Sequence, residues 1–224
     1  MKTLLTKPDS NPKVNKSMQY GYWTPILHLA PANLSGKNTC LKSTAGCRAS
    51  CLNTAGRGHM SIIQKARIRK TNDFFNNYDQ FMTQLKKEIK SAQITAKNKG
   101  LKLAIRLNGT SDLLWENSGI MDQFPDVQFY DYTKYPNRKR LPKNYHLTFS
   151  KAEDNEKDMK KAIKRGLNVA VVFEKYLPKT FLNRPVVNGD KSDLRFLDGE
   201  NVVVGLIAKG QAKKDQSGFV INQA

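Results

Sequence analysis

The sequence contains no long uninterrupted run of apolar residues, and its first residues include no apolar segment. A membrane-spanning helix needs about 20 predominantly apolar residues in a row, and nothing in the 224 residues approaches that length. The start, "MKTLLTKPDSNPKVNKS", is polar after its fifth residue, whereas a secretory signal has an apolar centre. The sequence therefore predicts a cytoplasmic protein with no membrane partner.

Cysteine and acidic residues are also scarce. Three cysteines is an odd number, which argues against a disulfide framework in a chain without an export signal. Only 19 acidic side chains stand against 38 Lys and Arg, so the net charge is +19. Such an excess is typical of proteins with a polyanionic partner. We expect nucleic acid or another phosphorylated ligand as that partner; the alternative is a lysine-rich surface that serves solubility alone.

The order of the predicted elements indicates an α/β fold. Residues 1–19 are rich in Pro, Asn and Lys and predict a flexible N-terminal arm, while residues 20–224 predict a single barrel-like domain. Strand-like apolar runs alternate with helices or turns, which is typical of parallel strands joined by crossovers. Six units predict a partial (β/α)6 TIM-like barrel with a cysteine loop after strand 1, and a doubly wound open sheet is the alternative. The predicted strands span residues 20–31, 101–109, 126–134, 144–150, 167–174 and 201–210.

All three cysteines lie in "NTCLKSTAGCRASCLNTAGRGH", residues 38–59. Cys40, Cys47 and Cys51 have the spacing C-x6-C-x3-C, and His59 follows them. Buried cysteines that act as small apolar residues usually lie in apolar runs. These have polar and basic neighbours, which favours metal ligation.

Two kinds of metal site fit this spacing. With His59 as the fourth ligand, the site would be a closed structural zinc centre. Without it, the three cysteines would hold three irons of a [4Fe-4S] cluster and leave the fourth iron open. The loop follows the first strand at its carboxyl end, where a barrel has its active site, and this position favours the cluster.

Four stretches resemble a family of proteins encoded by phages and mobile elements: "NTCLKSTAGCRASCLNTAGRG", "RLNGTSD", "NGDKSDLRFLD" and "VVGLIAKG". The three-cysteine loop after a first strand also resembles the radical-SAM superfamily of partial barrels. These resemblances imply a [4Fe-4S] cluster, SAM as a second cofactor and, for a phage protein, a location in the host cytoplasm. Two departures speak against SAM. The superfamily spacing is C-x3-C-x2-C, and "NGTSD" (residues 108–112) stands where a Gly-Gly-Glu motif would bind the SAM amino group.

Polar and basic side chains follow the predicted strands, and such positions face a common pocket in parallel folds. Four of them are lysines, which would form a cationic mouth suited to a phosphate, a carboxylate or a nucleic-acid backbone. Because lysine is abundant throughout the chain, chance placement is the alternative. The candidate ligand-binding residues are Arg106, Asn108, Thr110, Asp112, Asp131, Lys134, Lys151, Lys175 and Lys209.

Two further patterns involve acidic residues. Asp190, Asp193 and Asp198 form an acidic island, for which we expect a turn with a structural Asp–Arg195 pair rather than a divalent-cation site. In addition, "SKAE" (residues 150–153) matches a capping box that would begin a helix.

These features leave two classes of function open. One is an enzyme of radical-SAM-like design that acts on a phosphorylated or nucleic-acid substrate. The other is a non-enzymatic, basic nucleic-acid-binding protein in which a [4Fe-4S] cluster or a zinc ion staples the long loop.

Overall fold

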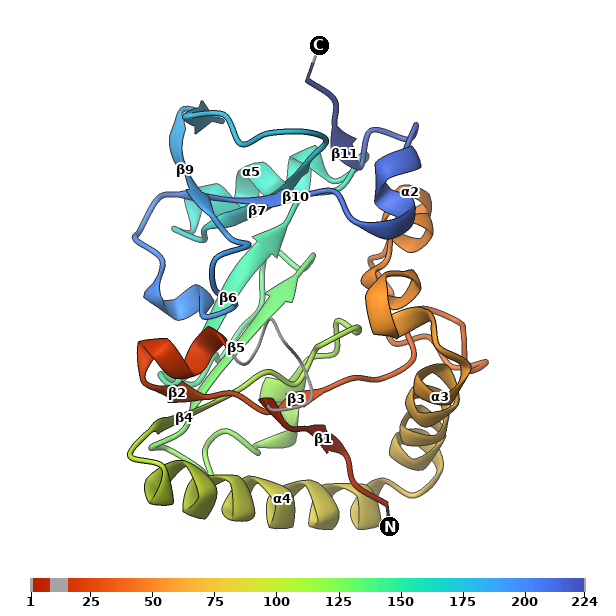
Figure 1. Cartoon of the computed structure of the whole chain (residues 1–224), viewed down its shortest axis with the longest axis vertical. Coiled ribbons are helices and arrows are strands. Elements are labelled where there is room, and N and C mark those ends of the chain that lie inside the picture. Colours follow the sequence, from red (N-terminus) through yellow and green to blue (C-terminus); the bar gives the residue numbers. More distant parts are fainter. Residues whose placement is uncertain (1, 9–15, 224) are drawn as a thin grey trace.

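The computed structural model describes residues 2–8 and 16–223 and is built around one large sheet (Figure 1). Its strands lie in the order β2-β4-β5-β6-β7-β10-β9-β8, and β11 pairs with β7. Neighbours are parallel except in the hairpin of β8 and β9. The strands are β2 (Tyr22–Trp23), β4 (Lys102–Ile105), β5 (Gln128–Thr133), β6 (Tyr145–Ser150), β7 (Val169–Phe173), β8 (Thr180–Phe181), β9 (Arg184–Asn188), β10 (Val203–Ile207) and β11 (Val220–Ile221).

The prediction of a partial (β/α)6 TIM-like barrel was wrong. The main sheet is open and mixed, and its edges are β2 and β8. Two of the connections are not α-helical crossovers: the 3-10 helix η5 (Trp115–Ser118) lies between β4 and β5, and the β8–β9 hairpin lies between β7 and β10. Short irregular connections and helical crossovers leave a similar alternation of apolar and polar runs, so the sequence pattern could not separate them.

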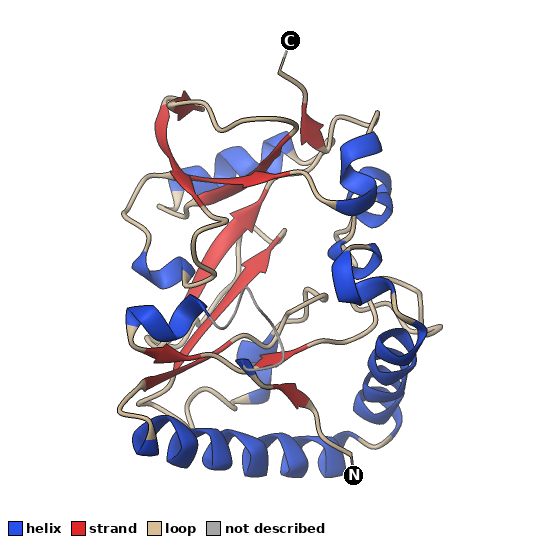
Figure 2. Ribbon diagram, viewed as in Figure 1, coloured by secondary structure: helices blue, strands red, loops and turns tan. Residues whose placement is uncertain are grey.

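Four α-helices accompany the sheet in the described part of the chain: α2 (Ala45–Ala49), α3 (Ser61–Asn76), α4 (Tyr78–Asn98) and α5 (Glu156–Lys164). In Figure 2, α4 crosses below the sheet, while α2 and α3 lie along one side of it. Apolar residues recur every three or four positions in α4, and this stripe is buried because it packs on the core beside β4. The buried stripe consists of Phe81, Met82, Leu85, Ile89, Ala92 and Ala96.

Part of the predicted arm, residues 1–19, belongs to the fold. Strand β1 (Leu5–Thr6) pairs antiparallel with β3 (Ile26–Leu27). The Glu88 carboxylate accepts the backbone N–H groups of Leu4 at 2.9 Å and of Leu5 at 2.8 Å. Residues 1 and 9–15, to which the arm prediction also applies, lie outside the described residues.

The sheet divides at the carboxyl ends of its central strands. β6 and β7 pair at two positions, the second of which joins Ser150 to Ala170. Beyond this point β11 lies beside the end of β7. Separated strand ends in a parallel sheet leave a crevice, which is where ligands bind in open α/β folds.

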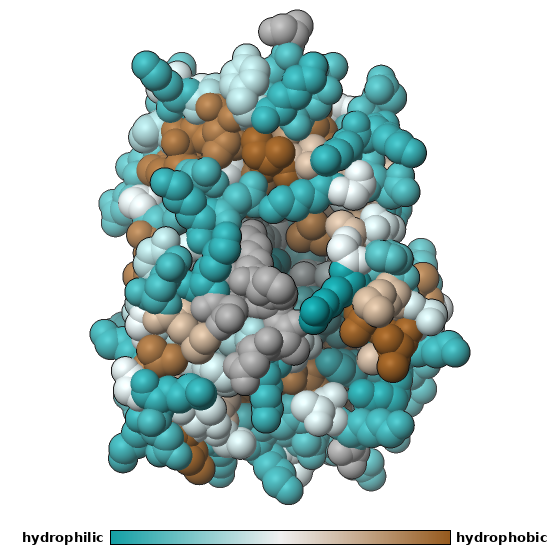
Figure 3. Space-filling model, in the orientation of Figure 1, coloured by the Kyte–Doolittle hydropathy of each residue, from teal (hydrophilic) through white to brown (hydrophobic). Residues whose placement is uncertain are grey.

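The surface in Figure 3 is largely hydrophilic, with hydrophobic side chains gathered in a band near the top and in a patch at the right. Within residues 2–8 and 16–223, no helix combines the length and the apolar character that a membrane span requires.

We expect truncation of the α4 stripe to destabilise the whole fold. Ile89 is fully buried, and Ile89→Ala should lower the free energy of unfolding by about 2–5 kcal/mol because it removes apolar contacts and leaves a cavity. Ile94 lies on the same helix but is 62% exposed, so Ile94→Ala should change that free energy by about 0.5 kcal/mol or less. Urea denaturation followed by circular dichroism measures both. Equal losses in the two variants would contradict this packing.

Candidate functional site

A cavity of about 510 Å³ lies where the sheet divides. The cysteine loop forms one wall, and the carboxyl ends of the strands form the other. Its volume lies in the range of small-molecule pockets, roughly 300–1,000 Å³. Nine of the predicted site residues line it: Cys40, Cys47, Cys51, Arg106, Asn108, Thr110, Asp112, Lys134 and Lys209.

The three cysteines are partly buried and free of disulfides. The Sγ atom of Cys40 lies 3.7 Å from the carbonyl oxygen of Thr110 on the opposite wall. The Sγ atom of Cys51 accepts the backbone N–H of Asn53 at 3.5 Å. Burial raises the pKa of the Cys40 and Cys51 thiols, so both resist ionisation unless a cation or a metal stabilises the thiolate.

A buried lysine provides a positive charge beside these thiols. The Lys134 ammonium donates to the Ser150 hydroxyl at 3.1 Å and is only 9% exposed. Burial alone would lower the pKa of Lys134, but the neighbouring Cys47 and Asp112 raise it by a larger amount. The pKa of Lys134 therefore lies above its ordinary value. Lys134 thus stays charged and places a positive charge beside the Cys47 side chain.

The cysteine loop is held in place by Glu153, a residue from the other half of the chain. One carboxylate oxygen accepts the Thr44 hydroxyl at 2.6 Å, and the other accepts the backbone N–H of Gly46 at 2.6 Å. Thr44 in turn caps α2 by accepting the backbone N–H of Cys47 at 3.1 Å. A Cβ atom on Gly46 would come within 1.9 Å of the Ser217 hydroxyl, so the loop packs tightly here.

The predicted capping box at residues 150–153 was therefore wrong. Ser150 is the last residue of β6, and α5 begins only at Glu156. The Glu153 carboxylate reaches across to the cysteine loop and does not cap a helix that begins at Ser150. A local motif could not reveal this partner, since it lies more than a hundred residues away in the chain.

His59 does not join the cysteines. It is exposed in the 3-10 helix η4 (Gly56–His59), where its Nδ1 contacts the carbonyl oxygen of Gly56, and it does not line the cavity. Across residues 2–8 and 16–223, no group of three or more His, Cys, Asp or Glu side chains is arranged to hold a metal ion. This arrangement speaks against a Cys3His zinc site.

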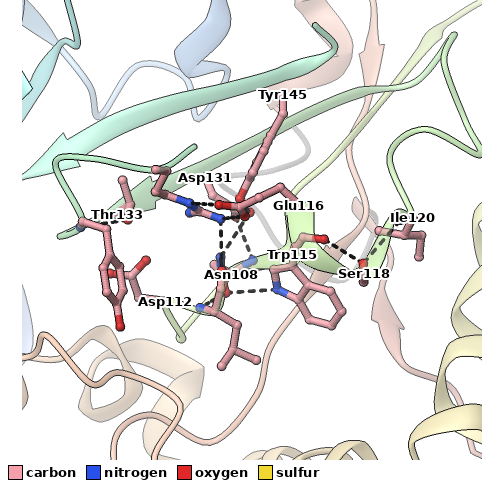
Figure 4. Close-up of polar contacts among 12 residues, drawn as sticks. Asn108, Asp112, Trp115, Glu116, Ser118, Ile120, Asp131, Thr133 and Tyr145 are labelled. Carbon is pink, nitrogen blue, oxygen red and sulfur yellow. Dashed lines mark hydrogen bonds and ion pairs between the residues drawn. The ribbon is translucent and has the colours of Figure 1, made fainter. Parts of the chain in front are cut away.

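Asn108 organises the wall opposite the cysteines (Figure 4). Its Oδ1 accepts the Ser111 hydroxyl, the Leu113 N–H and the Trp115 indole N–H at 2.8, 2.9 and 3.1 Å. Its backbone N–H donates to Asp131 at 2.7 Å, and its Nδ2 donates to the carbonyl oxygen of Leu113 at 3.0 Å. The Asn108 amide is thus used to hold residues 111–115 in place.

Asp131 lies behind this wall and does not line the cavity. It is fully buried and accepts the Tyr145 hydroxyl at 2.9 Å. Burial raises its pKa to about 7, although the Arg106 guanidinium, 3.9 Å away, acts in the opposite direction. Arg106 also pairs with Asp193 at 3.2 Å and lies 4.7 Å from the ring centre of Tyr132. This network makes Asp131 a structural carboxyl group rather than a ligand-binding one.

The acidic island is distributed over three ion pairs. Asp190 pairs with Lys209 at 2.5 Å, Asp193 with Arg106, and Asp198 with Arg195 at 3.2 Å. The expected structural pair with Arg195 thus forms through Asp198. With a cation against each carboxylate, these residues join the loop after β9 to the cavity wall.

Two of the four lysines predicted at the mouth, Lys151 and Lys175, do not line the cavity. Lys175 is exposed and lies 3.7 Å from Glu174, and burial lowers the pKa of the half-buried Lys151. The apolar part of the lining was not predictable from the sequence. Val172 and Leu206 lie near the ends of β7 and β10, both of which fall within predicted strands, but no sequence pattern indicated that Phe219 would lie beside them.

These features define an α/β protein with three thiols gathered at the carboxyl ends of its parallel strands. Residues 2–223 match the family described as Gene product 88, and the chain belongs to this phage-type family. No curated protein and no solved structure matches the chain. The comparisons therefore agree with the resemblance to phage proteins and give no support to the resemblance to the radical-SAM superfamily.

Removal of the Glu153 carboxylate should loosen the cysteine loop. Glu153→Ala eliminates both hydrogen bonds to the loop, and we expect amide exchange of residues 44–51 to accelerate by at least about tenfold, which corresponds to 1.4 kcal/mol, because hydrogen bonds to charged groups contribute about 1.5–3 kcal/mol each. The exposed neighbour Asp154 is the matched control, as Asp154→Ala. Unchanged exchange in Glu153→Ala would show that the loop does not depend on this contact.

Asp131 should make stability depend on pH. Its pKa rises from 3.8 to about 7 on folding, so the folded state keeps a proton that the unfolded state releases between these values. The free energy of unfolding should therefore fall as the pH rises through this window, with a slope of at most about 1.4 kcal/mol per pH unit.

Asp131→Asn should flatten that slope, whereas the exposed Asp126→Asn should leave it unchanged. Urea denaturation between about pH 4.5 and 7.5 measures the dependence. A constant difference between Asp131→Asn and the unmodified protein over this range would contradict the raised pKa.

Proposed function

We propose that this protein is an iron–sulfur protein whose [4Fe-4S] cluster is held in the cavity by Cys40, Cys47 and Cys51. The single observation that carries the proposal is that all three thiols, from one short stretch of sequence, line the same cavity at the ends of the strands. Soft thiolate ligands select zinc or iron–sulfur centres among biological metals.

The donor set fits a cluster better than a single ion. A zinc site needs four ligands that converge on one point, with Zn–S distances of about 2.3 Å, and His59, the fourth ligand that the sequence suggested, does not line the cavity. In a cluster each cysteine binds a different iron, so the three sulfurs stand apart around a larger body. Burial holds the pKa of two of the thiols high, and a coordinated metal removes that obstacle because it deprotonates the thiol outright.

The chain's own residues would give such a centre a defined environment. Glu153 and Thr44 fix the loop that bears the cysteines, and Lys134 offsets negative charge next to Cys47. When bound, the cluster would supply a redox centre and, at the iron without a cysteine, an open coordination position. The strand-end wall of the cavity lies opposite the cysteine loop and leaves room for a small ligand.

The proposal does not include SAM. Residues 108–112 stand where the Gly-Gly-Glu motif of the radical-SAM superfamily would be. The side-chain amide of Asn108 is already hydrogen-bonded to the backbone of Leu113. A Cβ on Gly109 would come within 2.7 Å of the His28 and Ile26 side chains, so this segment is closely packed against its neighbours.

As the partner we propose a phosphate-bearing ligand, either nucleic acid or a smaller phosphorylated molecule. The net charge of +19 supports this class of partner. A nucleic-acid-binding protein with a purely structural cluster is the second candidate, and the same charge favours it.

Anaerobic reconstitution with iron and sulfide tests the cluster. We expect about four irons per chain, a brown colour and, after reduction, an electron paramagnetic resonance signal. Cys40→Ser, Cys47→Ser and Cys51→Ser should each lose most of the iron, whereas His59→Ala should retain it because His59 lies away from the cavity. A colourless protein with one zinc, lost in His59→Ala, would overturn the proposal. Circular dichroism of each variant shows whether it has folded.

A further inference from the structure

A second pocket of about 410 Å³ opens on the outside of the cysteine loop. Lys42, which lies between Cys40 and Cys47 in the sequence, forms part of its lining, and Tyr135 and Lys139 contribute from the loop after β5. Lys161 comes from α5. The pocket is thus separate from the thiol-lined cavity, although it shares the same loop.

Positive charge exceeds negative charge in this pocket. Four cationic side chains line it against two carboxylates, Glu116 and Asp158. Glu116 is buried and forms a two-pronged pair with Arg138. Asp158 accepts Lys42 at 2.8 Å and lies 3.6 Å from Lys161. The local excess of two positive charges is therefore open to an anion.

Several donors in the pocket have unused capacity. An ammonium group has three N–H donors, and Lys42 and Lys161 share one carboxylate between them. Lys139 is exposed. Arg138 is only 5% exposed, and its Nη1 is buried without a hydrogen-bond partner. Such buried unpaired donors are rare in folded proteins, and each one asks for an explanation.

The pocket also offers an aromatic and an apolar surface. Lys42 lies 5.8 Å from the ring centre of Tyr135, and Leu114, 38% exposed, lines the same pocket. A tetrahedral phosphate suits several converging cations because it presents several acceptor oxygens. An adjacent aromatic ring suits a nucleobase, since every base has a π-face.

We propose that this pocket binds the phosphate of a nucleotide, with Lys139 and Lys161 as its principal cationic contacts. The inference rests on the proposed phosphate-bearing partner and assigns that partner a place on the molecule. Two sources supply this chemistry, a free nucleotide and a single nucleic-acid strand, because a phosphate is common to both.

Binding of two probes tests the site: AMP and fluorescein-labelled d(T)10. The double variant Lys139→Gln/Lys161→Gln should weaken binding of AMP or d(T)10 at least about fivefold at 50 mM salt, and for d(T)10 it should reduce the salt slope by about 1 for each phosphate-contacting lysine removed. The matched control is Lys87→Gln/Lys90→Gln, which removes the same charge from exposed positions of α4. Asp158→Asn should tighten binding because it removes a carboxylate from the pocket.

The outcomes separate the pocket from the partner class. Binding of AMP that responds to the pocket variants identifies a free nucleotide, and a response confined to d(T)10 identifies a strand. If the probes bind but the control pair loses as much affinity as the pocket pair, the partner class stands and the pocket is wrong. If neither AMP nor d(T)10 binds at all, both proposals fail. An unchanged or weaker affinity in Asp158→Asn would also contradict the pocket.

Discussion

The side chain of Asn108 is the contact on which the cavity wall depends. This side chain forms hydrogen bonds with the Trp115 indole N–H, the Ser111 hydroxyl, and the backbone N–H and carbonyl of Leu113. The backbone N–H of Asn108 donates to the buried Asp131. A buried polar group costs free energy of folding when it has no hydrogen-bond partner, whereas a fully paired buried network holds its residues in one arrangement. A network of this kind fixes residues 111–115 in one arrangement, and Asp112 and Lys134 are positioned by the same loop because the Lys134 N–H donates to Asp112 at 2.8 Å.

The opposite wall depends on a contact of the same kind from a different part of the chain. Helix α2 has only five residues, which is too short to hold its shape alone, because nucleation of a single helical turn is unfavourable. The Glu153 carboxylate stabilises the amino end of this helix by accepting hydrogen bonds from the Thr44 hydroxyl and the Gly46 N–H. The position of the short helix that carries Cys47 therefore depends on a residue after β6, so this wall of the cavity needs contacts between distant parts of the chain.

The sequence predicted some of this and not the rest, for physical reasons. Each of the six predicted segments contains at least one strand, and two of them, residues 167–174 and 201–210, were clear because burial on both faces leaves a nearly continuous apolar run. The α4 stripe was equally visible, since its period of 3.6 is a local property. The barrel was wrong because strand order and edge pairing depend on connections whose conformation short polar segments do not encode. The partner of Glu153 and the burial of Asp131 were missed because both are contacts between distant segments.

Within the candidate site, the cysteines were the most predictable residues and the lysines the least. Three thiols in one polar loop had few alternative explanations, and the fold brings them to one cavity. Lysine is frequent everywhere in this sequence, so its position after a strand carries little information. Only two of the four predicted lysines, Lys134 and Lys209, line the cavity, whereas Lys151 and Lys175 do not.

The two pockets differ in their charge, and therefore in the kind of ligand that each can accept. Around the thiol-lined cavity, Arg106 and Lys209 are each paired with an aspartate, so the large positive excess of the chain is not concentrated there. It is carried by exposed lysines, many of them on α4 and α5. An extended polyanion is attracted by that outer surface, whereas the partly enclosed cavity suits a small molecule. If both proposals hold, a phosphate would bind in the pocket outside the cysteine loop, and the reactions of the thiols would take place in the cavity on the other side of that loop.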